Sequence, residues 1–406
     1  MTKQNKPQTW TKFRHRVITE AVRLILTAHV VSKYHIKAER FKGQGNRQYL
    51  VLFNHQTAYD QFFVGLAFKG PVYYMATEDI FSMGWVSSLI RYLVAPIPIR
   101  KQTTDIAAIR NCVRVAKEGG TIALAPEGNR TYSGRTEYIN PSIVSLIRML
   151  KLPVALLRIE GGYGIQPRWA GKVRKGSMRS YVSQVIEPET WQELSNDELY
   201  SRIVEGLAVN ENCLSGEFPT KAPAEFLDRA IYTCPDCGLS TFHSQGDILR
   251  CTKCGKETRY LPTKELRGVN WDCPFPFVAE WYDYQKAYVN SLDTHALTEQ
   301  PLFADTAQLS RVIVFKHKEL LRQTAAIHLY GDRMVVDQGA ENELQLPFSQ
   351  VSAVVCLGPN KLNVYCGEDV YQFKGDKHFN SLKYTNLFHR YQNIAKGEAH
   401  VEFLGL

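Results

Sequence analysis

The sequence predicts a layered α/β domain, then a small cysteine-bearing domain, then a β-rich C-terminal domain that ends in a helix. Strand and helix candidates alternate through the first half, two Cys-x-x-Cys pairs follow, and short apolar runs separated by turns fill the last hundred residues or so. With 406 residues, 44% of them hydrophobic, the chain can bury two or three cores. We divide it into an N-terminal helix (1–40), the α/β domain (41–210), a helical linker (211–232), the cysteine-bearing domain (233–263), a second helical linker (264–300) and the β-rich domain (301–406).

The α/β domain is predicted from hydrophobic periodicity, because short apolar runs bounded by turns indicate buried strands and longer amphipathic stretches indicate helices. We expect strands at residues 49–53, 71–75, 121–125, 153–159 and 180–186. We expect helices at residues 61–67, 83–93, 104–118 and 140–151. Residues 189–232 are expected to be helical, with a loop near 216–223.

The first strand leads directly into a turn that contains His55 and Asp60. On one helix, residues five apart would lie roughly 140° apart around the axis and could not touch. On a strand-to-helix turn they can, with Asp60 accepting a hydrogen bond from one imidazole nitrogen while the other nitrogen acts as a base. The alternative is a surface histidine and an N-cap aspartate that never meet.

Three more blocks follow: an apolar stretch that ends at Arg100, the turn Pro126-Glu127-Gly128-Asn129-Arg130, and a strand that opens at Pro153. In this order and spacing, the four blocks resemble the glycerolipid acyltransferase family. Its hallmark is a histidine, four residues and an aspartate, followed by a Pro-Glu-Gly block. The resemblance covers roughly residues 40–210 and implies a layered glycerolipid-acyltransferase-like fold. Three features depart from the family pattern: Ala125 and Asn129 stand where Phe and Thr are more usual, and the block before Arg100 lacks the usual Gly and Phe.

The resemblance implies acyl transfer from a thioester to a hydroxyl. His55 would take the proton from the acceptor hydroxyl as that oxygen attacks the thioester carbonyl. Asp60 would fix the histidine tautomer and stabilise the imidazolium. No protein nucleophile is needed, because the acceptor hydroxyl plays that part. The implied catalytic residues are therefore His55 and Asp60.

The resemblance also implies a set of substrate-binding residues: Arg100, Lys101, Glu127, Gly128, Arg130 and Pro153. The two arginines would bind the acceptor phosphate, with Lys101 assisting or remaining solvated. Glu127 would contact glycerol hydroxyls or support the loop, and Gly128 would let the backbone approach the ligand. Pro153 matches a block linked to acyl-donor binding. As alternatives, Arg130 forms a salt bridge to Glu127 that only rigidifies the loop, and Arg100 is a solvent-exposed cation.

Four of the nine cysteines form the pairs Cys234/Cys237 and Cys251/Cys254, each followed by glycine. Thirteen residues separate the pairs, a spacing that suits a tetrahedral, structural zinc ion and resembles a zinc ribbon. The alternative, a redox-active pair, lacks the flanking strand–helix pattern. The scattered remaining cysteines indicate a reducing cytosol rather than disulfides.

Nearly all of the formal net charge of +9 lies in residues 1–43, where ten Lys or Arg face two Glu. The spacing of apolar residues from Trp10 to Val31 predicts one amphipathic helix over residues 10–31, with these residues in one stripe. Lys12, Arg16 and Arg23 fall on the opposite face. Such a helix suits an anionic membrane surface, while packing on its own domain is the alternative. No apolar run is long enough to span a bilayer, and no secretory signal is expected. We therefore expect a cytoplasmic protein, peripheral on the inner face of a membrane.

The last hundred residues combine short strand-like runs with a final helix at about residues 379–395. This pattern resembles a pleckstrin-homology-like or GRAM-like domain.

Two functions from different classes follow from these patterns. The first is an acyltransferase of phospholipid biosynthesis, with acyl-CoA or acyl-carrier protein as donor and a lysophospholipid, similar to lysophosphatidic acid, as acceptor. The alternative is a non-catalytic lipid- or polyanion-binding adaptor that uses the zinc ribbon and the C-terminal domain. Nucleic acid is not an expected partner, because only Arg250 is cationic between Cys237 and Cys251.

Overall fold

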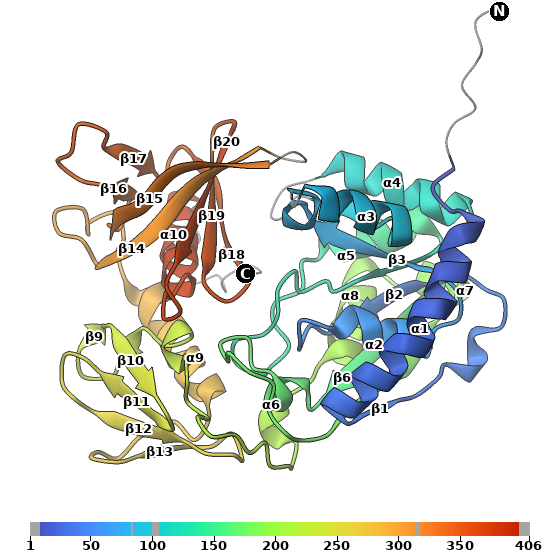
Figure 1. The fold of residues 1–406 in the computed structure, drawn as a ribbon, viewed down its shortest axis with the longest axis horizontal. Coiled ribbons are helices and arrows are strands. Elements are labelled where there is room, and N and C mark those ends of the chain that lie inside the picture. The colour runs from blue at the N-terminus through green and yellow to red at the C-terminus, as the bar shows by residue number, and fades with distance from the viewer. Residues whose placement is uncertain (1–8, 83, 100–104, 314–316, 398–406) are drawn as a thin grey trace, which may run out of the picture.

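A seven-stranded, mostly parallel sheet forms the centre of the N-terminal half in the computed structural model, which describes residues 9–82, 84–99, 105–313 and 317–397 (Figure 1). The strand order is β1-β7-β6-β2-β5-β3-β4, and only the β6–β7 pair is antiparallel. The strands are β1 (Ile36–Ala38), β2 (Leu50–Phe53), β3 (Val72–Thr77), β4 (Ile97–Ile99), β5 (Thr121–Leu124), β6 (Val154–Glu160) and β7 (Met178–Ile186). The five expected strands are thus confirmed, and β1 and β4 were not foreseen.

Helices cover both faces of this sheet, which is why β2 is buried along its whole length. Leu50 and Leu52 point into a core with α4, α5 and α8, whereas Val51 and Phe53 point into a core with α1 and α2. The helices are α1 (Phe13–Tyr34), α2 (Asp60–Ala67), α3 (Trp85–Val94), α4 (Ile106–Lys117), α5 (Ser142–Leu150), α6 (Gly162–Ile165), α7 (Pro188–Glu193) and α8 (Asn196–Leu207). The four helices expected within the domain are confirmed.

The segment after α8 corrects one expectation. Between Leu207 and Thr233 the chain contains only the 3-10 turns Glu211–Cys213 and Leu227–Arg229, not further α-helices. Two other 3-10 turns lie at Lys42–Gln44 and Glu78–Ser82. Proline and glycine between 216 and 223 suit this extended path, because they disfavour helix.

The cysteine-bearing region consists of a two-stranded pair, β8–β9, and a four-stranded antiparallel sheet in the order β10-β11-β12-β13. Helix α9 (Val278–Ser291) packs beside them, close to the helix expected there. The strands are β8 (Thr233–Cys234), β9 (Gly238–Leu239), β10 (Phe242–Gln245), β11 (Ile248–Cys251), β12 (Glu257–Tyr260) and β13 (Leu266–Gly268).

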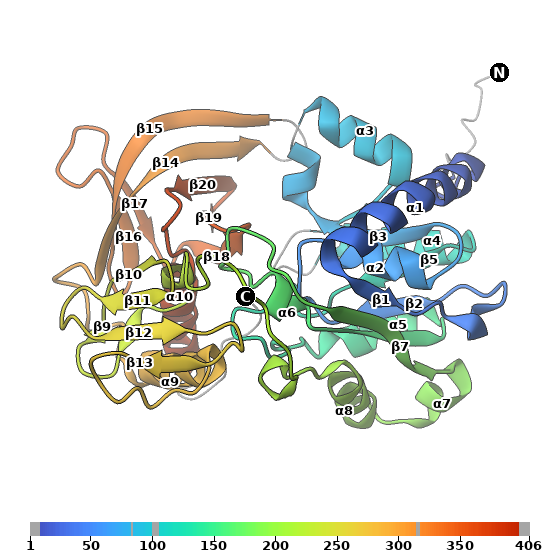
Figure 2. The same ribbon diagram turned by 60° about the horizontal axis from the view of Figure 1, so that its bottom comes forward.

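The C-terminal region is a seven-stranded antiparallel sheet in the order β17-β16-β15-β14-β20-β19-β18, with α10 (Leu382–Ala395) packed on β18 (Figure 2). Its strands are β14 (Phe303–Ile313), β15 (His317–Leu329), β16 (Arg333–Val336), β17 (Leu344–Pro347), β18 (Val351–Leu357), β19 (Lys361–Cys366) and β20 (Asp369–Gly375). The expected β-rich character and terminal helix are confirmed, whereas β14 and β17 were missed.

One continuous buried core joins the three regions. Tyr132 and Trp169 of the N-terminal half pack in the same cluster as Trp281 of α9 and residues of the C-terminal sheet. Arg168 adds a polar link, because its guanidinium donates to the Cys356 carbonyl over 3.3 Å. The regions are therefore packed together and not merely tethered.

Candidate functional site

The site is built where β2 ends at the carboxyl edge of the sheet and the chain turns into α2. Asn54, fully buried, anchors this turn to the neighbouring strand β6. Its amide donates to the Ile159 carbonyl over 2.8 Å and accepts from the Ile159 N–H over 2.7 Å. The turn that carries His55 is therefore held against the sheet from its first residue.

The structure brings His55 and Asp60 together. The distance from His55 Nδ1 to Asp60 Oδ2 is 2.8 Å, and the histidine side chain is 25% exposed while the aspartate is fully buried. The same carboxylate accepts hydrogen bonds from the backbone N–H groups of Gln56 and Thr57 and from the Thr57 hydroxyl, which lies 2.6 Å from Oδ1. Since a carboxylate accepts, Nδ1 carries the proton, and the basic lone pair is on Nε2.

Glu127 supports the backbone around this pair. Its two carboxylate oxygens accept from the N–H groups of His55 and Glu137, each over 2.7 Å. The Thr131 N–H also donates to the His55 carbonyl over 3.1 Å. Burial raises the pKa of Glu127 well above its usual value. Of the two roles expected for Glu127, this geometry favours loop support over substrate contact.

Gly128 forms the sharp corner of this loop at the end of β5. Its φ of 71° lies in the left-handed region, which favours glycine over residues with a Cβ atom. The adjoining Arg130 is tied down by Arg168. Its Nη2 donates to the Arg168 carbonyl over 3.2 Å, and Arg168 Nη1 donates back to the Arg130 carbonyl over 3.0 Å.

Another nitrogen of the Arg130 guanidinium, Nη1, is buried and meets no hydrogen-bond partner within the described part of the chain. Burial and the nearby Arg168 lower the pKa of Arg130 to about 10, so the group is still cationic at neutral pH. A cation with an unused donor beside the His55 loop is suited to an anionic ligand.

The structure places Pro153 away from His55 and does not describe two other predicted site residues. Arg100 and Lys101 lie outside the described residues. Pro153 precedes β6, and its carbonyl accepts from the Leu50 N–H at the amino end of β2. Because β2 and β6 are parallel, Pro153 lies at the opposite edge of the sheet from the turn that holds His55.

Helix α1 packs on the site and also exposes an apolar face. Tyr34 at its end is buried against Tyr59 of the His55 turn, with ring centroids 5.3 Å apart. Phe13, Leu24 and Ile25 are 81%, 77% and 72% exposed. The packing of this helix on its own domain is therefore confirmed, and its attachment to a membrane surface stays a prediction.

Arg23 was expected to face anionic headgroups, and this expectation is wrong. Its guanidinium donates to the Phe68 carbonyl and pairs with Glu20, and its side chain is only 9% exposed. The residue fastens α1 to the end of α2 instead. Within the part of the chain that the structure describes, no helix is both long and apolar enough to cross a bilayer.

Sequence reasoning missed two positioning residues of the turn. Thr57 donates to Asp60, and the Gln56 side chain accepts from the Tyr163 N–H over 3.0 Å. Thr57 lies three residues before Asp60, which is the spacing of a helix capping box and could have identified it. No local signal identifies Gln56, because its partner is more than a hundred residues away.

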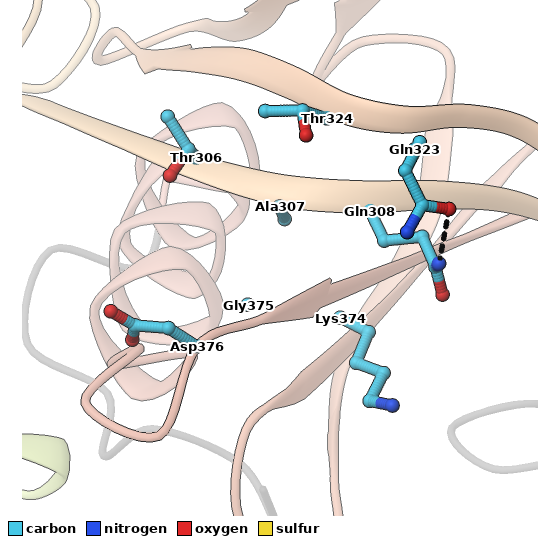
Figure 3. Close-up of a pocket in the computed structure, with 8 residues that line it drawn as sticks. All are labelled: Thr306, Ala307, Gln308, Gln323, Thr324, Lys374, Gly375 and Asp376. Atoms are coloured by element: carbon cyan, nitrogen blue, oxygen red, sulfur yellow. Dashed lines mark hydrogen bonds between the residues drawn. The ribbon is translucent and has the colours of Figure 1, made fainter.

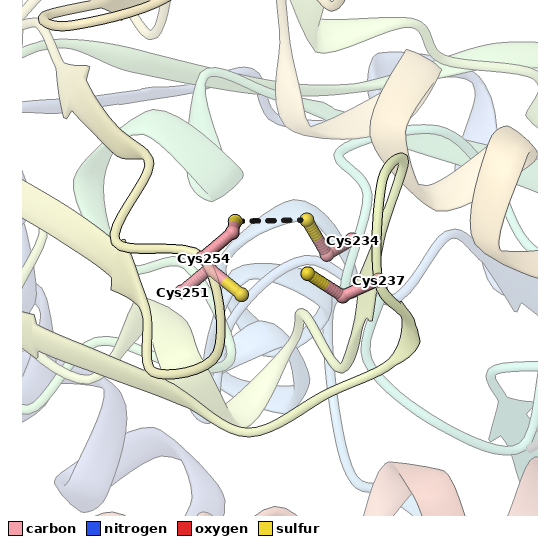
Figure 4. A group of neighbouring side chains, drawn as sticks. All are labelled: Cys234, Cys237, Cys251 and Cys254. Atoms are coloured by element: carbon pink, nitrogen blue, oxygen red, sulfur yellow. Dashed lines mark hydrogen bonds between the residues drawn. The ribbon is translucent and has the colours of Figure 1, made fainter.

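The four paired cysteines converge from two turns (Figure 4). Their sulfur atoms all lie within 4.8 Å of one another, and Cys234 and Cys254 are 3.7 Å apart. A tetrahedral zinc ion with Zn–S bonds of about 2.3 Å requires sulfurs about 3.8 Å apart, so the donor set fits this metal. Gly238 and Gly255, at φ 67° and 74°, form the turns after each pair.

A separate hollow of about 280 Å³ lies on the C-terminal sheet, where β14 and β15 change register beside Gly375 (Figure 3). Polar residues line it, and Gln308 donates to Gln323 over 3.0 Å within it. None of the His55 turn residues contributes to this hollow.

Comparison with known proteins shows that part of the N-terminal half is similar to acyltransferases. Residues 29–160 match the Acyltransferase family model. A 1-acyl-sn-glycerol-3-phosphate acyltransferase of Bacillus subtilis is 22% identical over 138 residues, which are 34% of this chain and 65% of that protein.

Two solved structures show weaker likenesses. The 1-acyl-sn-glycerophosphate acyltransferase PlsC of Thermotoga maritima is 19% identical at a TM-score of 0.41, covering 48% of this chain and 78% of PlsC. The N-terminal PH domain of human ARAP2 is 12% identical at a TM-score of 0.20, covering 24% of this chain and 87% of that domain. Both scores are low, so the functional argument depends on the geometry and the family match. The match to the Acyltransferase family includes the turn that holds His55 and Asp60, and also Glu127 and Arg130.

Proposed function

We propose that the N-terminal domain transfers a fatty acyl chain from acyl-CoA or acyl-carrier protein to the free hydroxyl of a lysophospholipid similar to lysophosphatidic acid. The observation that carries the proposal is the 2.8 Å contact between His55 Nδ1 and a fully buried, fully hydrogen-bonded Asp60. The family match and the name of the Bacillus subtilis relative support it.

The chemistry follows from this geometry. Nε2 of His55 takes the proton as the acceptor oxygen attacks the thioester carbonyl. The carbon–sulfur bond then breaks, and the leaving thiolate takes the proton from the His55 imidazolium, so that the products are an ester and a free thiol. Asp60 stabilises the imidazolium between these steps, and Arg130 supplies a cation for the acceptor phosphate.

The test is an activity panel with the purified full chain, labelled acyl-CoA or acyl-carrier protein, and several lysophospholipids. We expect transfer to a phosphate-bearing acceptor. His55→Ala should lower turnover about 10²–10⁴-fold, whereas the exposed His317→Ala should not. Turnover near the wild-type value in His55→Ala would exclude this mechanism. Arg130→Ala should raise the KM for the acceptor rather than for the donor. The rise should correspond to a loss of about 1.5–3 kcal/mol of binding free energy.

We also propose peripheral attachment to the cytosolic leaflet of an anionic membrane. Two helices supply exposed apolar side chains, with Leu24 and Ile25 on α1 and Trp85, 77% exposed, on α3. Arg14 joins the helices, because its guanidinium donates to the Tyr92 carbonyl and lies over the Tyr92 ring. An exposed apolar face of this kind is typical of membrane-surface helices.

Vesicle sedimentation tests the attachment. Leu24→Glu with Ile25→Glu should reduce pelleting with vesicles that contain anionic phospholipid. Val269→Glu, at an exposed apolar position in the cysteine-bearing region, is the matched control. Equal pelleting of both variants and the wild type would place the attachment elsewhere.

Finally, we propose that Cys234, Cys237, Cys251 and Cys254 hold one structural zinc ion. Four thiolates leave no open coordination position, so the ion would stabilise the two turns and not take part in acyl transfer. Metal analysis of the purified chain should find zinc that Cys254→Ser loses and that Cys213→Ser, at another exposed cysteine, retains. Zinc retained in Cys254→Ser would reject the site.

A further inference from the structure

A second group of ligating side chains lies where the cysteine-bearing sheet meets the C-terminal region. Asp228 is in the 3-10 turn Leu227–Arg229, His243 is on β10, and His378 is in the loop between β20 and α10. One ligand atom from each of the three lies within 4.8 Å of the others. No part of the acyl-transfer site uses these residues.

Asp228 is 4% exposed, and its two oxygens are in different situations. Oδ2 accepts from the Ser244 N–H over 3.0 Å and faces His378 Nδ1 over 2.7 Å. Oδ1 is buried and has no hydrogen-bond partner among the described residues. A buried carboxylate oxygen without a donor is costly in free energy, and a bound cation would remove that cost.

The two histidines are placed to complete a site. Their rings lie 5.4 Å apart with an interplanar angle of 30°. His243 is exposed on β10, and His378 is 36% exposed, so an ion can reach them from solvent. Asp228 and His378 also line a cavity of about 40 Å³, which has room for a water ligand. The neighbouring Arg229 is turned away, since its guanidinium donates to the carbonyls of Trp169 and Lys377.

We propose that Asp228, His243 and His378 form a second site for a divalent transition-metal ion such as Zn²⁺. Two imidazole nitrogens and one carboxylate oxygen are a donor set that suits these ions, and three protein ligands leave a position for water. Binding through His378 Nδ1 replaces its hydrogen bond to Asp228, and the imidazole proton is then held on Nε2. The ion joins segments that are far apart in sequence, so it clamps the cysteine-bearing sheet to the C-terminal region.

The experiment counts zinc ions bound by the full chain after equilibrium dialysis against micromolar Zn²⁺, and compares wild type with His243→Ala. His243 is exposed and its replacement leaves the buried Asp228 in place, so the variant should fold. We expect wild type to bind one zinc ion more than His243→Ala does at this concentration, because the substitution weakens binding at this site at least about 10-fold. His317→Ala should bind as many zinc ions as wild type. Because the readout is a difference, it does not depend on the occupancy of the four-cysteine site.

Thermal unfolding provides the second measurement. Added Zn²⁺ should raise the Tm of wild type more than that of His243→Ala, because an ion that binds the folded state stabilises it. Asp228→Asn, where it folds, should behave as His243→Ala does. Equal zinc content and equal Tm shifts in wild type and His243→Ala would overturn the proposal and leave a hydrogen-bonded Asp228–His378 pair only.

Discussion

Two histidine–aspartate pairs lie in different parts of this chain. His55 and Asp60 are 2.8 Å apart at the end of β2, and His378 and Asp228 are 2.7 Å apart beside β10. Both aspartates are buried. Both oxygens of Asp60 accept hydrogen bonds, whereas only one oxygen of Asp228 does.

The difference teaches that the surroundings, not the pair itself, decide what a histidine–aspartate contact can do. A carboxylate with both oxygens saturated holds one imidazole in one tautomer, which is what a general base requires. A carboxylate that has one buried oxygen without a hydrogen bond, and that lies near two histidines, can bind a metal cation. The two pairs should therefore respond differently to the same substitutions.

The largest expected effect separates the two pairs by function. His55→Ala should lose about 10²–10⁴-fold in turnover, because a general base contributes that much, while its zinc content stays at the wild-type value. His378→Ala should lose one zinc ion. Steady-state kinetics and metal analysis on the same preparations measure both. A His55→Ala variant that loses zinc but keeps turnover would reverse the two assignments.

A third buried carboxylate, Glu211, sharpens the comparison through pH. Its Oε1 accepts from the Gly161 N–H over 2.7 Å, and Lys264 Nζ lies 3.9 Å from Oε2, which has no hydrogen-bond partner in the described ranges. Burial raises the pKa of Glu211 from 4.5 to about 7. The folded state therefore binds this proton more tightly than the unfolded chain does, and stability falls as pH rises through this window.

We expect the free energy of unfolding to fall by about 3 kcal/mol between pH 4.5 and pH 7 on account of Glu211, since each pKa unit corresponds to about 1.4 kcal/mol. Urea unfolding at several pH values measures this. Glu211→Gln should show a flatter profile, whereas the exposed Glu193→Gln should keep the wild-type slope. Identical slopes for Glu211→Gln and wild type would contradict the prediction.

Amide substitutions should distinguish the two aspartates in stability. Asp60→Asn places an NH₂ group against hydrogen-bond donors and should cost about 1–3 kcal/mol of unfolding free energy. Asp228→Asn should cost less in the presence of EDTA, because its NH₂ group can occupy the position of Oδ1, which forms no hydrogen bond among the described residues. Denaturant unfolding of both variants decides the matter, and equal losses would show that the unused oxygen has no energetic significance.

The smallest expected effect concerns Thr57, whose hydroxyl donates to Asp60 over 2.6 Å. Thr57→Val keeps the shape and removes two hydrogen bonds, the one donated to Asp60 and the one accepted from the Tyr59 N–H, so we expect a loss of about 0.5–1.5 kcal/mol in stability for each. Thr57→Ser should restore it. A Thr57→Val variant as stable as wild type would mean that the other donors to Asp60 compensate.

Local patterns allowed much of the fold to be predicted from the sequence. The strands around His55 were found as short apolar runs bounded by turns, and the helices from the period of their buried faces. By contrast, β14 was missed, because its buried apolar residues are spaced irregularly, at positions 303, 307, 309 and 312, with polar residues between them. The α-helices expected in 208–232 are absent. That segment takes its conformation from packing against α9 and the C-terminal sheet, which a local pattern does not encode.

By itself, the sequence determined the His55–Asp60 turn, whose two residues are five positions apart, and the convergence of the paired cysteines, because two Cys-x-x-Cys turns at this spacing suit one metal ion. Only the tertiary structure decided that Glu127 holds the backbone of His55, that Pro153 lies at the other edge of the sheet, and that Arg23 is committed to Phe68. It alone also brought Asp228 to His378 across 150 residues of chain. The physical reason is that such contacts depend on strand order and on which faces pack together, and hydrophobic periodicity encodes neither.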